Sequence, residues 1–279
     1  MKTEPLEDNW YDIISKAARG LQIDTVTLAK SHWNEQNAKE LFEGICHPAT
    51  LVAIATRLHL DGNALLAMTI DQYHPGPIII PKNFQRFTTS YHGMKVNSYL
   101  FWSEENKNAI AFDTGASLDP LYQQLEKEQL KLNAIFLTHG HSDHVCQLQQ
   151  LINKTGSLAW IDKRDIINEA QPLPKNYRYH LDSTITIESR STPGHSPGGT
   201  TFVIHGISPM ITIVGDALFA GSVGGIPPSS YQRALQVIRE KILSLPEETI
   251  IAPGHGPLTT VGEEKRHNPF FSAWLEDSK

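Results

Sequence analysis

The sequence predicts an α/β (α+β) protein in which mixed sheets are covered by helices and preceded by a small helical segment. The first 73 or so residues space their apolar side chains as on helix faces. Further along, short apolar runs alternate with amphipathic stretches, which favours layered strands and helices. With 279 residues, of which 40% are hydrophobic and 19% charged, the chain can bury a sizeable core.

The N-terminal part is predicted to form several helices. Trp10, Ile13 and Ile14 fall on one helix face, and Gly20 suits the end of that helix. Asp61 is placed to cap a later helix. The expected helices cover residues 9–21, 31–45, 47–60 and 61–70. The proline-rich stretch 73–81 ends this pattern, so we expect a domain boundary that separates residues 1–80 from residues 81–279.

Beyond this boundary, strands are expected to alternate with helices. Apolar runs bounded by turn residues indicate strands, and amphipathic runs indicate helices. The expected strands lie within residues 97–102, 108–115, 133–140, 158–162, 183–190, 200–206, 210–219 and 248–256. The expected helices cover residues 119–131, 143–156, 163–170 and 229–245.

Composition excludes several classes of partner. A net charge of −6 does not favour binding to nucleic acid or to an acidic membrane. No apolar run approaches the ~20 residues that a membrane span needs, and the N-terminus shows no signal peptide. The two cysteines lie a hundred positions apart and suggest no disulfide framework. We therefore expect a cytoplasmic protein.

The stretch LTHGHSDHV, residues 137–145, gathers the side chains His139, His141, Asp143 and His144 after an apolar strand. Residues two apart in an extended turn point the same way, so His139 and His141 are expected to converge. Imidazole and carboxylate donors suit zinc, iron or manganese. For any single histidine, an exposed turn residue without a metal is the more probable interpretation.

Three further stretches repeat the same design of a strand end, small residues and then a side chain that can bind metal. His195 lies in TPGHSPGG, Asp216 in IVGDALF and His255 in IAPGHGP. Glycine permits the close backbone approach that wrapping a metal ion requires. Seven such side chains at four strand ends are difficult to explain as independent accidents, so the sequence predicts a metal centre.

The order H-x-H-x-D-H, P-G-H, G-D and P-G-H-G resembles the metallo-β-lactamase superfamily, and the surrounding residues are most similar to its glyoxalase II-like hydrolases. The resemblance covers roughly residues 84–270 and implies an αββα sandwich with two metal ions at one edge. It implies that His139, His141 and His195 bind the first metal and that Asp143, His144 and His255 bind the second. Asp216 would bridge both metals, and Asp113 would orient the ligand loop.

The resemblance further implies two divalent metal ions, with zinc expected and iron or manganese as alternatives. It implies hydrolysis of a thioester or ester of a small acyl compound by a metal-bridging hydroxide, assisted by Asp143 and Asp216. One alternative is an iron-dependent oxidoreductase of the persulfide dioxygenase type. Another is a lactonase on the same scaffold, and a third is a binding protein without activity.

Two departures from the glyoxalase II pattern bear on the substrate. No Lys or Arg occurs between Asp216 and Arg233, and the chain ends at residue 279, soon after NPFF. Both features leave an anionic glutathione group without expected partners. The resemblance still implies thioester hydrolysis by a hydroxyacylglutathione hydrolase-like enzyme, whereas it stays open whether glutathione is part of the substrate.

The N-terminal segment has several candidate roles. It could cover the active site, form a homodimer through its helices or bind DNA, since residues 49–68 resemble a helix-turn-helix. Residues 1–80 hold six Lys and Arg against ten Asp and Glu, which disfavours DNA. A helical packing domain is the favoured interpretation. Cys146, near the metal motif, is expected to face the core as a small apolar side chain.

Overall fold

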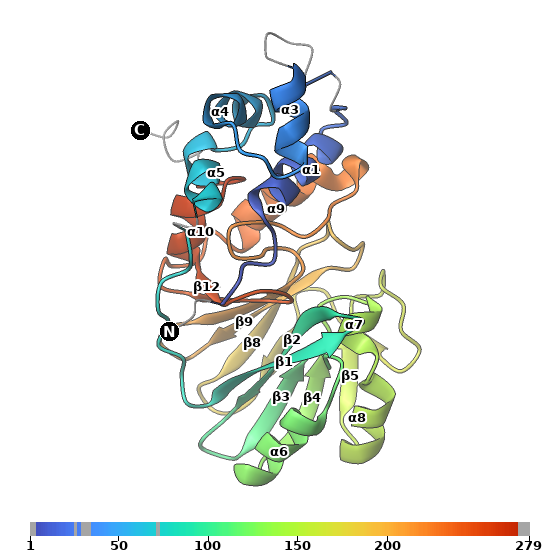
Figure 1. The fold of residues 1–279 in the computed structure, drawn as a ribbon. Coiled ribbons are helices and arrows are strands. Elements are labelled where there is room, and N and C mark those ends of the chain that lie inside the picture. The colour runs from blue at the N-terminus through green and yellow to red at the C-terminus, as the bar shows by residue number, and fades with distance from the viewer. Residues whose placement is uncertain (1–3, 25–26, 29–34, 71–72, 273–279) are drawn as a thin grey trace.

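Two six-stranded sheets lie face to face in the computed structural model, with helices on both outer sides (Figure 1). The structure describes residues 4–24, 27–28, 35–70 and 73–272. The strand order is β1-β2-β3-β4-β5-β6 in the first sheet and β12-β11-β10-β9-β8-β7 in the second. This αββα arrangement confirms the expected fold class.

The first sheet begins with the hairpin β1–β2 and continues through parallel strands. β2 pairs antiparallel with β1 and β3, and β3, β4, β5 and β6 pair in parallel. Its strands are β1 (Phe84–Tyr91), β2 (Met94–Trp102), β3 (Asn108–Phe112), β4 (Lys131–Phe136), β5 (Leu158–Ile161) and β6 (Gln171–Pro172).

The second sheet is antiparallel except where β10 pairs in parallel with β11. Its strands are β7 (Arg178–His180), β8 (Thr186–Ser191), β9 (Thr200–His205), β10 (Ile211–Gly215), β11 (Ile250–Pro253) and β12 (Thr259–Thr260). β9, β10 and β11 are buried over nearly their whole length, as strands covered on both faces must be.

Aromatic side chains fill the space between the sheets. Phe136 lies at the centre, with its ring centroid 5.1 Å from that of Phe202 and 5.5 Å from that of Trp160. Phe112 lies 5.6 Å from Phe202 by the same measure. These are the distances at which aromatic rings pack favourably. The strand ends that carry the candidate ligands therefore project from a rigid core.

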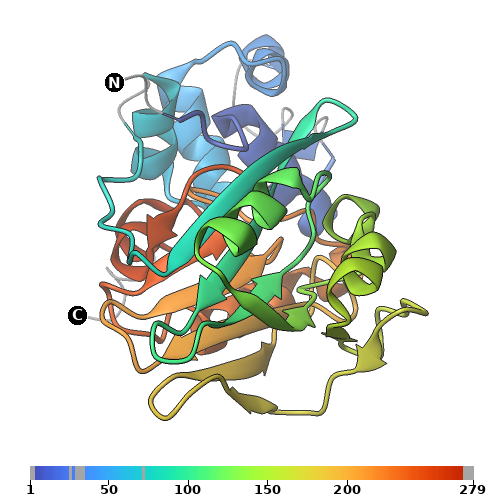
Figure 2. The same ribbon diagram turned by 90° about the horizontal axis from the view of Figure 1, so that it is seen from below.

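Each outer face of the sandwich carries its own helices. α6 (Asp119–Lys127), α7 (Ser142–Val145) and α8 (Leu148–Thr155) follow strands of the first sheet, and α6 and α8 cover its outer face in Figure 2. α9 (Tyr231–Lys241) and α10 (Val261–His267) lie on the side of the second sheet. A short 3₁₀ turn, η1 (Pro228–Ser230), leads into α9.

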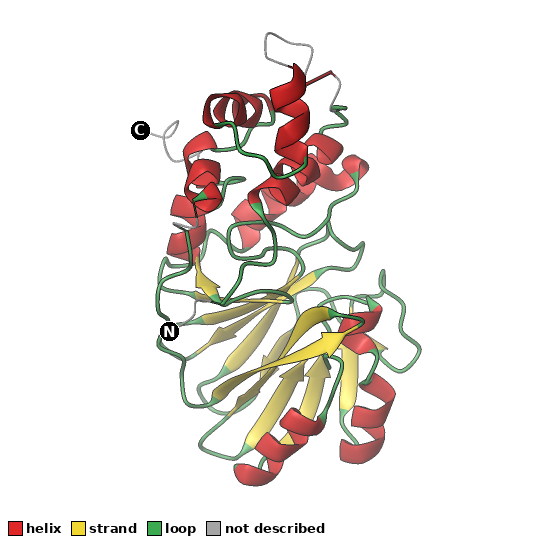
Figure 3. Cartoon of the chain, viewed as in Figure 1, coloured by secondary structure: helices red, strands yellow, loops and turns green. Residues whose placement is uncertain are grey.

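The N-terminal helices form a further layer on top of α9, at the top of Figure 3, where all helices are red. They are α1 (Trp10–Gly20), α3 (Glu35–Phe42), α4 (Pro48–Arg57) and α5 (Gly62–Thr69), and Asp61 caps α5 as expected. Their apolar faces share one core cluster with α9 and with Val203, Val214 and Ile251 of the second sheet. The boundary near residue 80 stays a prediction, although the helices before it are packed against the rest of the chain.

The prediction of a helix at residues 163–170 is wrong, because this stretch forms turns. Asp165 directs its carboxylate at two backbone N–H groups of neighbouring loops, which a helical course would prevent. Ile166 is 82% exposed, so the stretch lacks the buried face that stabilises a short helix. The helix expected at residues 143–156 is also interrupted, and it divides into α7 and α8.

Several elements were absent from the sequence-based expectation. β1 was not expected, and with β2 it forms a hairpin whose turn at His92 and Gly93 has positive φ angles. The short strands β6, β7 and β12 and the helix α10 were not expected either. Of the helix expected at residues 31–45, residues 31–34 lie outside the described residues and α3 accounts for the central part.

Among the described residues, no helix has the length and apolarity that crossing a membrane requires.

Candidate metal centre

All seven predicted ligands come together at one edge of the sandwich. His139, His141, Asp143 and His144 follow β4, while His195 lies in the turn between β8 and β9. Asp216 directly follows β10, and His255 follows β11. The ligand atoms fall into three overlapping groups, each within 4.8 Å: His139, His141 and His195; His139, His144 and Asp216; Asp143, His144 and His255.

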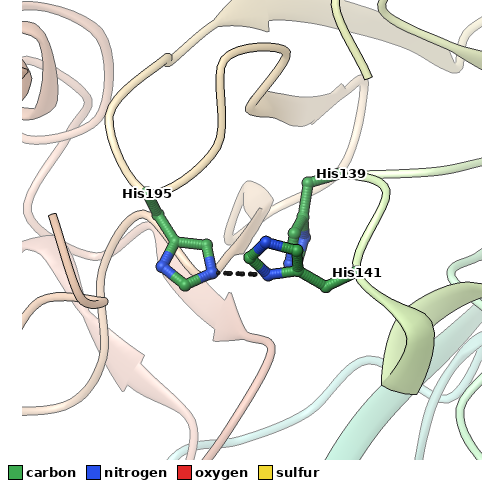
Figure 4. Close-up of side chains that lie close together, drawn as sticks. All are labelled: His139, His141 and His195. Carbon is green, nitrogen blue, oxygen red and sulfur yellow. Dashed lines mark hydrogen bonds between the residues drawn. The ribbon is translucent and has the colours of Figure 1, made fainter. Parts of the chain in front are cut away.

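The first group consists of three imidazoles (Figure 4). The ring centroids of His139 and His141 lie 4.6 Å apart, and those of His141 and His195 also lie 4.6 Å apart. His195 Nε2 and His141 Nδ1 face each other at 2.9 Å. The three rings converge from two loops more than fifty residues apart in the sequence, so they form a three-nitrogen pocket.

The group of Asp143, His144 and His255, called the second group from here on, combines two imidazoles with a carboxylate. Asp143 Oδ2 lies 3.2 Å from His255 Nε2 and 3.6 Å from His144 Nε2. Asp216 lies between the two groups, with carboxylate oxygens 3.3 Å from His144 Nε2 and 3.4 Å from both His195 Nε2 and His255 Nε2. A carboxylate in this position can face two cations at once.

The geometry fits cations of the size of zinc. A tetrahedral ion with bonds of about 2.0–2.1 Å holds its ligand atoms about 3.3 Å apart, close to the separations above. Three of these atoms, His139 Nε2, His144 Nε2 and Asp216 Oδ1, are buried without a hydrogen-bond partner among the described residues. Buried polar atoms are rarely left unpaired, so these three atoms are suited to bind a cation.

Hydrogen bonds on the far side of the rings direct Nε2 of three of the histidines into the site. Nδ1 of His144, His195 and His255 bonds to Asp113 Oδ2 at 2.8 Å, Gly225 O at 2.9 Å and Lys95 O at 2.6 Å respectively. A proton on Nδ1 leaves the Nε2 lone pair available for a metal. Each acceptor thus selects the tautomer that a ligand needs.

Asp113 directly follows β3 and links the end of that strand to the ligand loop, in the positioning role that the resemblance implies. Its Oδ1 accepts the backbone N–H of Thr138 at 2.7 Å, and its Oδ2 accepts the Thr138 hydroxyl at 2.7 Å and His144 Nδ1–H. The Thr138 hydroxyl in turn lies 3.1 Å from His139 Nδ1. One buried carboxylate therefore orients two of the candidate ligands.

The pKa shifts follow from burial and from the concentration of carboxylates. Burial holds the pKa of His139 well below its ordinary value. Burial also favours the neutral form of His144, but Asp216 and Asp113 outweigh it and raise the pKa of His144 to about 10. Although burial would raise the pKa of Asp216, His144 and His255 keep it well below the usual range. The carboxylates thus attract positive charge into the site, as a cation centre requires.

Glycines of the motifs are required by close packing. A Cβ added at Gly254, just before His255, would lie 2.1 Å from Asp216 Oδ1. A Cβ at Gly224 would lie 1.9 Å from the Asp216 carbonyl oxygen. A larger residue at position 254 would displace the Asp216 carboxylate, and one at position 224 would displace the Asp216 backbone.

Asp165 was missed by the sequence-based reasoning. Its carboxylate accepts the N–H of Gly140 at 3.2 Å and the N–H of Gly198 at 2.8 Å. Gly140 separates His139 from His141, and Gly198 closes the turn that carries His195. Asp165 therefore joins the two loops of the first group, yet nothing in its local sequence signals this role.

Two other residues near the ligands need comment. Cys146 is exposed, and its thiol donates to Gly115 O at 3.4 Å, so the expectation that it faces the core is wrong.

Residues 194–198 read GHSPG and match the G-x-S-x-G pattern of serine hydrolases. This turn, however, joins two antiparallel strands, and Ser196 Oγ is buried without a hydrogen-bond partner among the described residues. No base is therefore in place to activate Ser196.

Fold and donor set together define a metallo-hydrolase. Residues 93–255 match the sequence model of the Metallo-beta-lactamase superfamily, which is more than half of the 279 residues. The chain belongs to this superfamily. The match begins in the β1–β2 hairpin and does not include the N-terminal helices.

Individual relatives agree with this assignment. The chain is 33% identical over 201 residues to hydroxyacylglutathione hydrolase GloC of Haemophilus influenzae, which covers 63% of this chain and 93% of the relative. The crystal structure of BLEG-1 B3 metallo-beta-lactamase superposes with a TM-score of 0.59 at 30% identity, covering 68% of this chain and 99% of that one. TTHA1623 in a di-iron-bound form has a TM-score of 0.54 at 29% identity, covering 66% and 100%.

Proposed function

We propose that the protein is an acyl hydrolase that uses two divalent metal ions to cleave a thioester or ester. The convergence of seven side chains on three overlapping groups of ligand atoms carries this proposal. The similarity to GloC, whose name describes hydrolysis of a glutathione thioester, supports the choice of an acyl substrate. In this proposal a water molecule, and not Ser196, attacks the acyl carbon.

Each residue has a role in the proposed centre. His139, His141 and His195 hold one ion, Asp143, His144 and His255 hold the other, and Asp216 contacts both. Zinc is the expected metal, since nitrogen and oxygen donors at these separations suit it. The same donors accept iron or manganese, and TTHA1623 is named as a di-iron form.

When bound, two such cations lower the pKa of water toward neutrality and polarise an acyl carbonyl. The chain's own residues then orient the reactants. Burial raises the pKa of Asp143, but the hydrogen bond with His255 and the charge of His144 outweigh it and lower the pKa below its ordinary value. Asp143 thus stays ionised and can accept a hydrogen bond from the attacking water. Asp113, through His144 and Thr138, keeps the ligand loop fixed during the reaction.

The proposed substrate is a small acyl compound recognised at its acyl bond. Between Asp216 and Arg233 the chain has no Lys or Arg, so an anionic tripeptide would lack cationic partners in that stretch. We propose that the thiol part of the substrate is not glutathione.

Metal analysis paired with a substrate panel tests the proposal. The protein, purified without added metal, is assayed for bound zinc, iron and manganese, and then with thioesters, esters, lactones, β-lactams and phosphoesters. Two metals per chain and thioester or ester turnover are the expected results. A single iron with oxygen consumption on a persulfide would contradict hydrolysis, and turnover confined to a β-lactam or a phosphoester would contradict the substrate class. Equal catalytic efficiency on a glutathione thioester and on a neutral thioester of the same acyl group would contradict the exclusion of glutathione.

A further inference from the structure

The N-terminal segment makes an ion pair that lies against the loop following Asp216. Lys16, in α1, pairs with Asp8, just before α1. The Lys16 ammonium also donates to the carbonyl oxygen of Val223 at 2.8 Å, and Asp8 Oδ2 accepts the hydroxyl of Ser222 at 2.5 Å. In Figure 1 this part of the chain descends from α1 toward the ends of the sheets.

Both charges are largely withdrawn from solvent. The exposed fractions of the side chains are 15% for Lys16 and 12% for Asp8. Their partners Ser222 and Val223 are fully buried. A charge in such a place depends on its partner, because loss of one leaves the other unpaired in a medium of low dielectric constant. The pair therefore holds a definite geometry at this loop.

The loop that the pair contacts also touches candidate ligands. Its Gly225 carbonyl oxygen accepts His195 Nδ1–H at 2.9 Å. Its Phe219 ring stands edge-on to the His255 ring, with centroids 5.7 Å apart, and the Lys16 ammonium lies 5.2 Å from the Phe219 centroid. A shift of this loop would turn one ligand of each proposed ion.

We propose that Asp8 and Lys16 are positioning residues of the metal centre, acting through residues 219–225 on His195 and His255. The inference rests on the proposed function in that it assumes a metal centre. It goes further because both residues precede residue 93, where the superfamily match begins. The N-terminal segment would then be part of the functional centre and not only a covering layer.

Variants of the pair test this inference by metal affinity. Lys16→Met keeps the length of the side chain without its charge, Asp8→Asn removes the opposite charge, and the double variant removes both. Lys16→Arg keeps the positive charge, so this variant should bind zinc as the wild type does. The matched control is Lys39→Met, which breaks the exposed Glu35–Lys39 pair on α3, where each side chain is 53% exposed. Zinc affinity is measured by competition with a chromophoric chelator, well below the melting temperature of each variant.

Loss of outer contacts to metal ligands typically weakens metal binding about 10- to 100-fold. We expect a loss of that size for Lys16→Met and Asp8→Asn, with near wild-type affinity for Lys16→Arg and Lys39→Met. Visible absorption of cobalt(II) bound in place of zinc should change in the same variants, since it reports ligand geometry. Where a single variant does not fold, the double variant decides, because it leaves no unpaired charge.

Two outcomes separate the inference from the proposed function. If folded variants melt at lower temperature but keep wild-type zinc affinity and cobalt spectrum, the pair only stabilises the fold and the inference is overturned. If the wild-type protein itself binds no metal, the proposed function fails first.

Discussion

At the scale of single residues, Asp216 is the side chain shared by all parts of the candidate centre. Its oxygens lie 3.3 to 3.4 Å from Nε2 atoms of His144, His195 and His255. Asp216→Ala should lose bound metal and nearly all hydrolysis, because it removes the only carboxylate facing both groups among the described residues. Elemental analysis and turnover of the purified variant check this. Full metal occupancy with wild-type turnover would refute the ligand assignment.

Asp165 provides a second prediction at this scale. Asp165→Asn retains one oxygen acceptor but places an amide N–H group against one of the two glycine N–H donors. We expect metal affinity to fall about 10- to 100-fold, as for other residues that orient ligands. Calorimetric titration with zinc measures this. Asp162→Asn is the control, since Asp162 lies in the same turn but pairs with Arg164.

Residues with ligand chemistry could be found from the sequence because they repeat one local design. Asp216 and His255 each follow an apolar run with small neighbours, and an apolar run also precedes His139. His195 instead follows an expected strand that ends in a turn of small residues. The structure brings them together because the ends of these strands meet at one edge. Asp165, Asp8 and Lys16 follow no such pattern, since each acts through long-range contacts that have no periodicity.

At the scale of elements, a buried carboxylate of α10 forms hydrogen bonds that hold this helix to the neighbouring segments. Glu264 Oε1 faces the hydroxyls of Tyr73 at 3.3 Å and Thr259 at 2.7 Å, while Oε2 accepts N–H groups of Gly221 at 3.0 Å and Asn268 at 2.7 Å. Burial raises the pKa of Glu264 to about 7. A proton on Oε1 can be donated to a hydroxyl, so the protonated acid satisfies all four neighbours.

This arrangement predicts a pH-dependent stability. Because the pKa of Glu264 is higher in the folded protein than in the unfolded chain, its stabilising contribution is complete below about pH 4.5 and is lost as pH rises through about 7. The full effect is roughly 3 kcal/mol. Glu264→Gln mimics the protonated acid, so its free energy of unfolding relative to wild type should increase across this range. Urea unfolding of both metal-free proteins from pH 4.5 to 7.5 measures the difference, and a constant difference would contradict the prediction.

Element type could be predicted where periodicity and burial agree. α1, α9 and the buried strands β9 and β10 follow their apolar patterns. The stretch 163–170 has helix-forming residues, but tertiary hydrogen bonds of Asp165 decide its course. β1 escaped prediction because its buried positions, Phe84 and Phe87, are three apart and do not alternate as in a regular strand.

At the scale of the whole molecule, the N-terminal helices and the sandwich are expected to unfold together. Tyr231 of α9 lies against α1 so closely that a Cβ added at Gly20 would be 2.2 Å from its ring. Gly20→Ala should therefore destabilise the protein by about 1–3 kcal/mol. Far-UV circular dichroism and tryptophan fluorescence should report one shared transition at a lower temperature. Gly76→Ala is the control, since its added Cβ meets only Glu263 Oε1 at 3.9 Å. Two separate transitions would indicate independent domains.

The pairing of β10 with β11 has a consequence for biosynthesis. Asp216 and His255 follow neighbouring parallel strands, but α9 is inserted between those strands in the chain. A parallel pair with a long crossover forms late in folding, since its loop entropy is lost before any contact compensates it. While the chain leaves the ribosome, the first three imidazoles are available long before His255 has been made. A cation captured early would thus meet at most the three nitrogens of the first group, and the proposed two-ion centre would be completed only after β11 has joined the sheet.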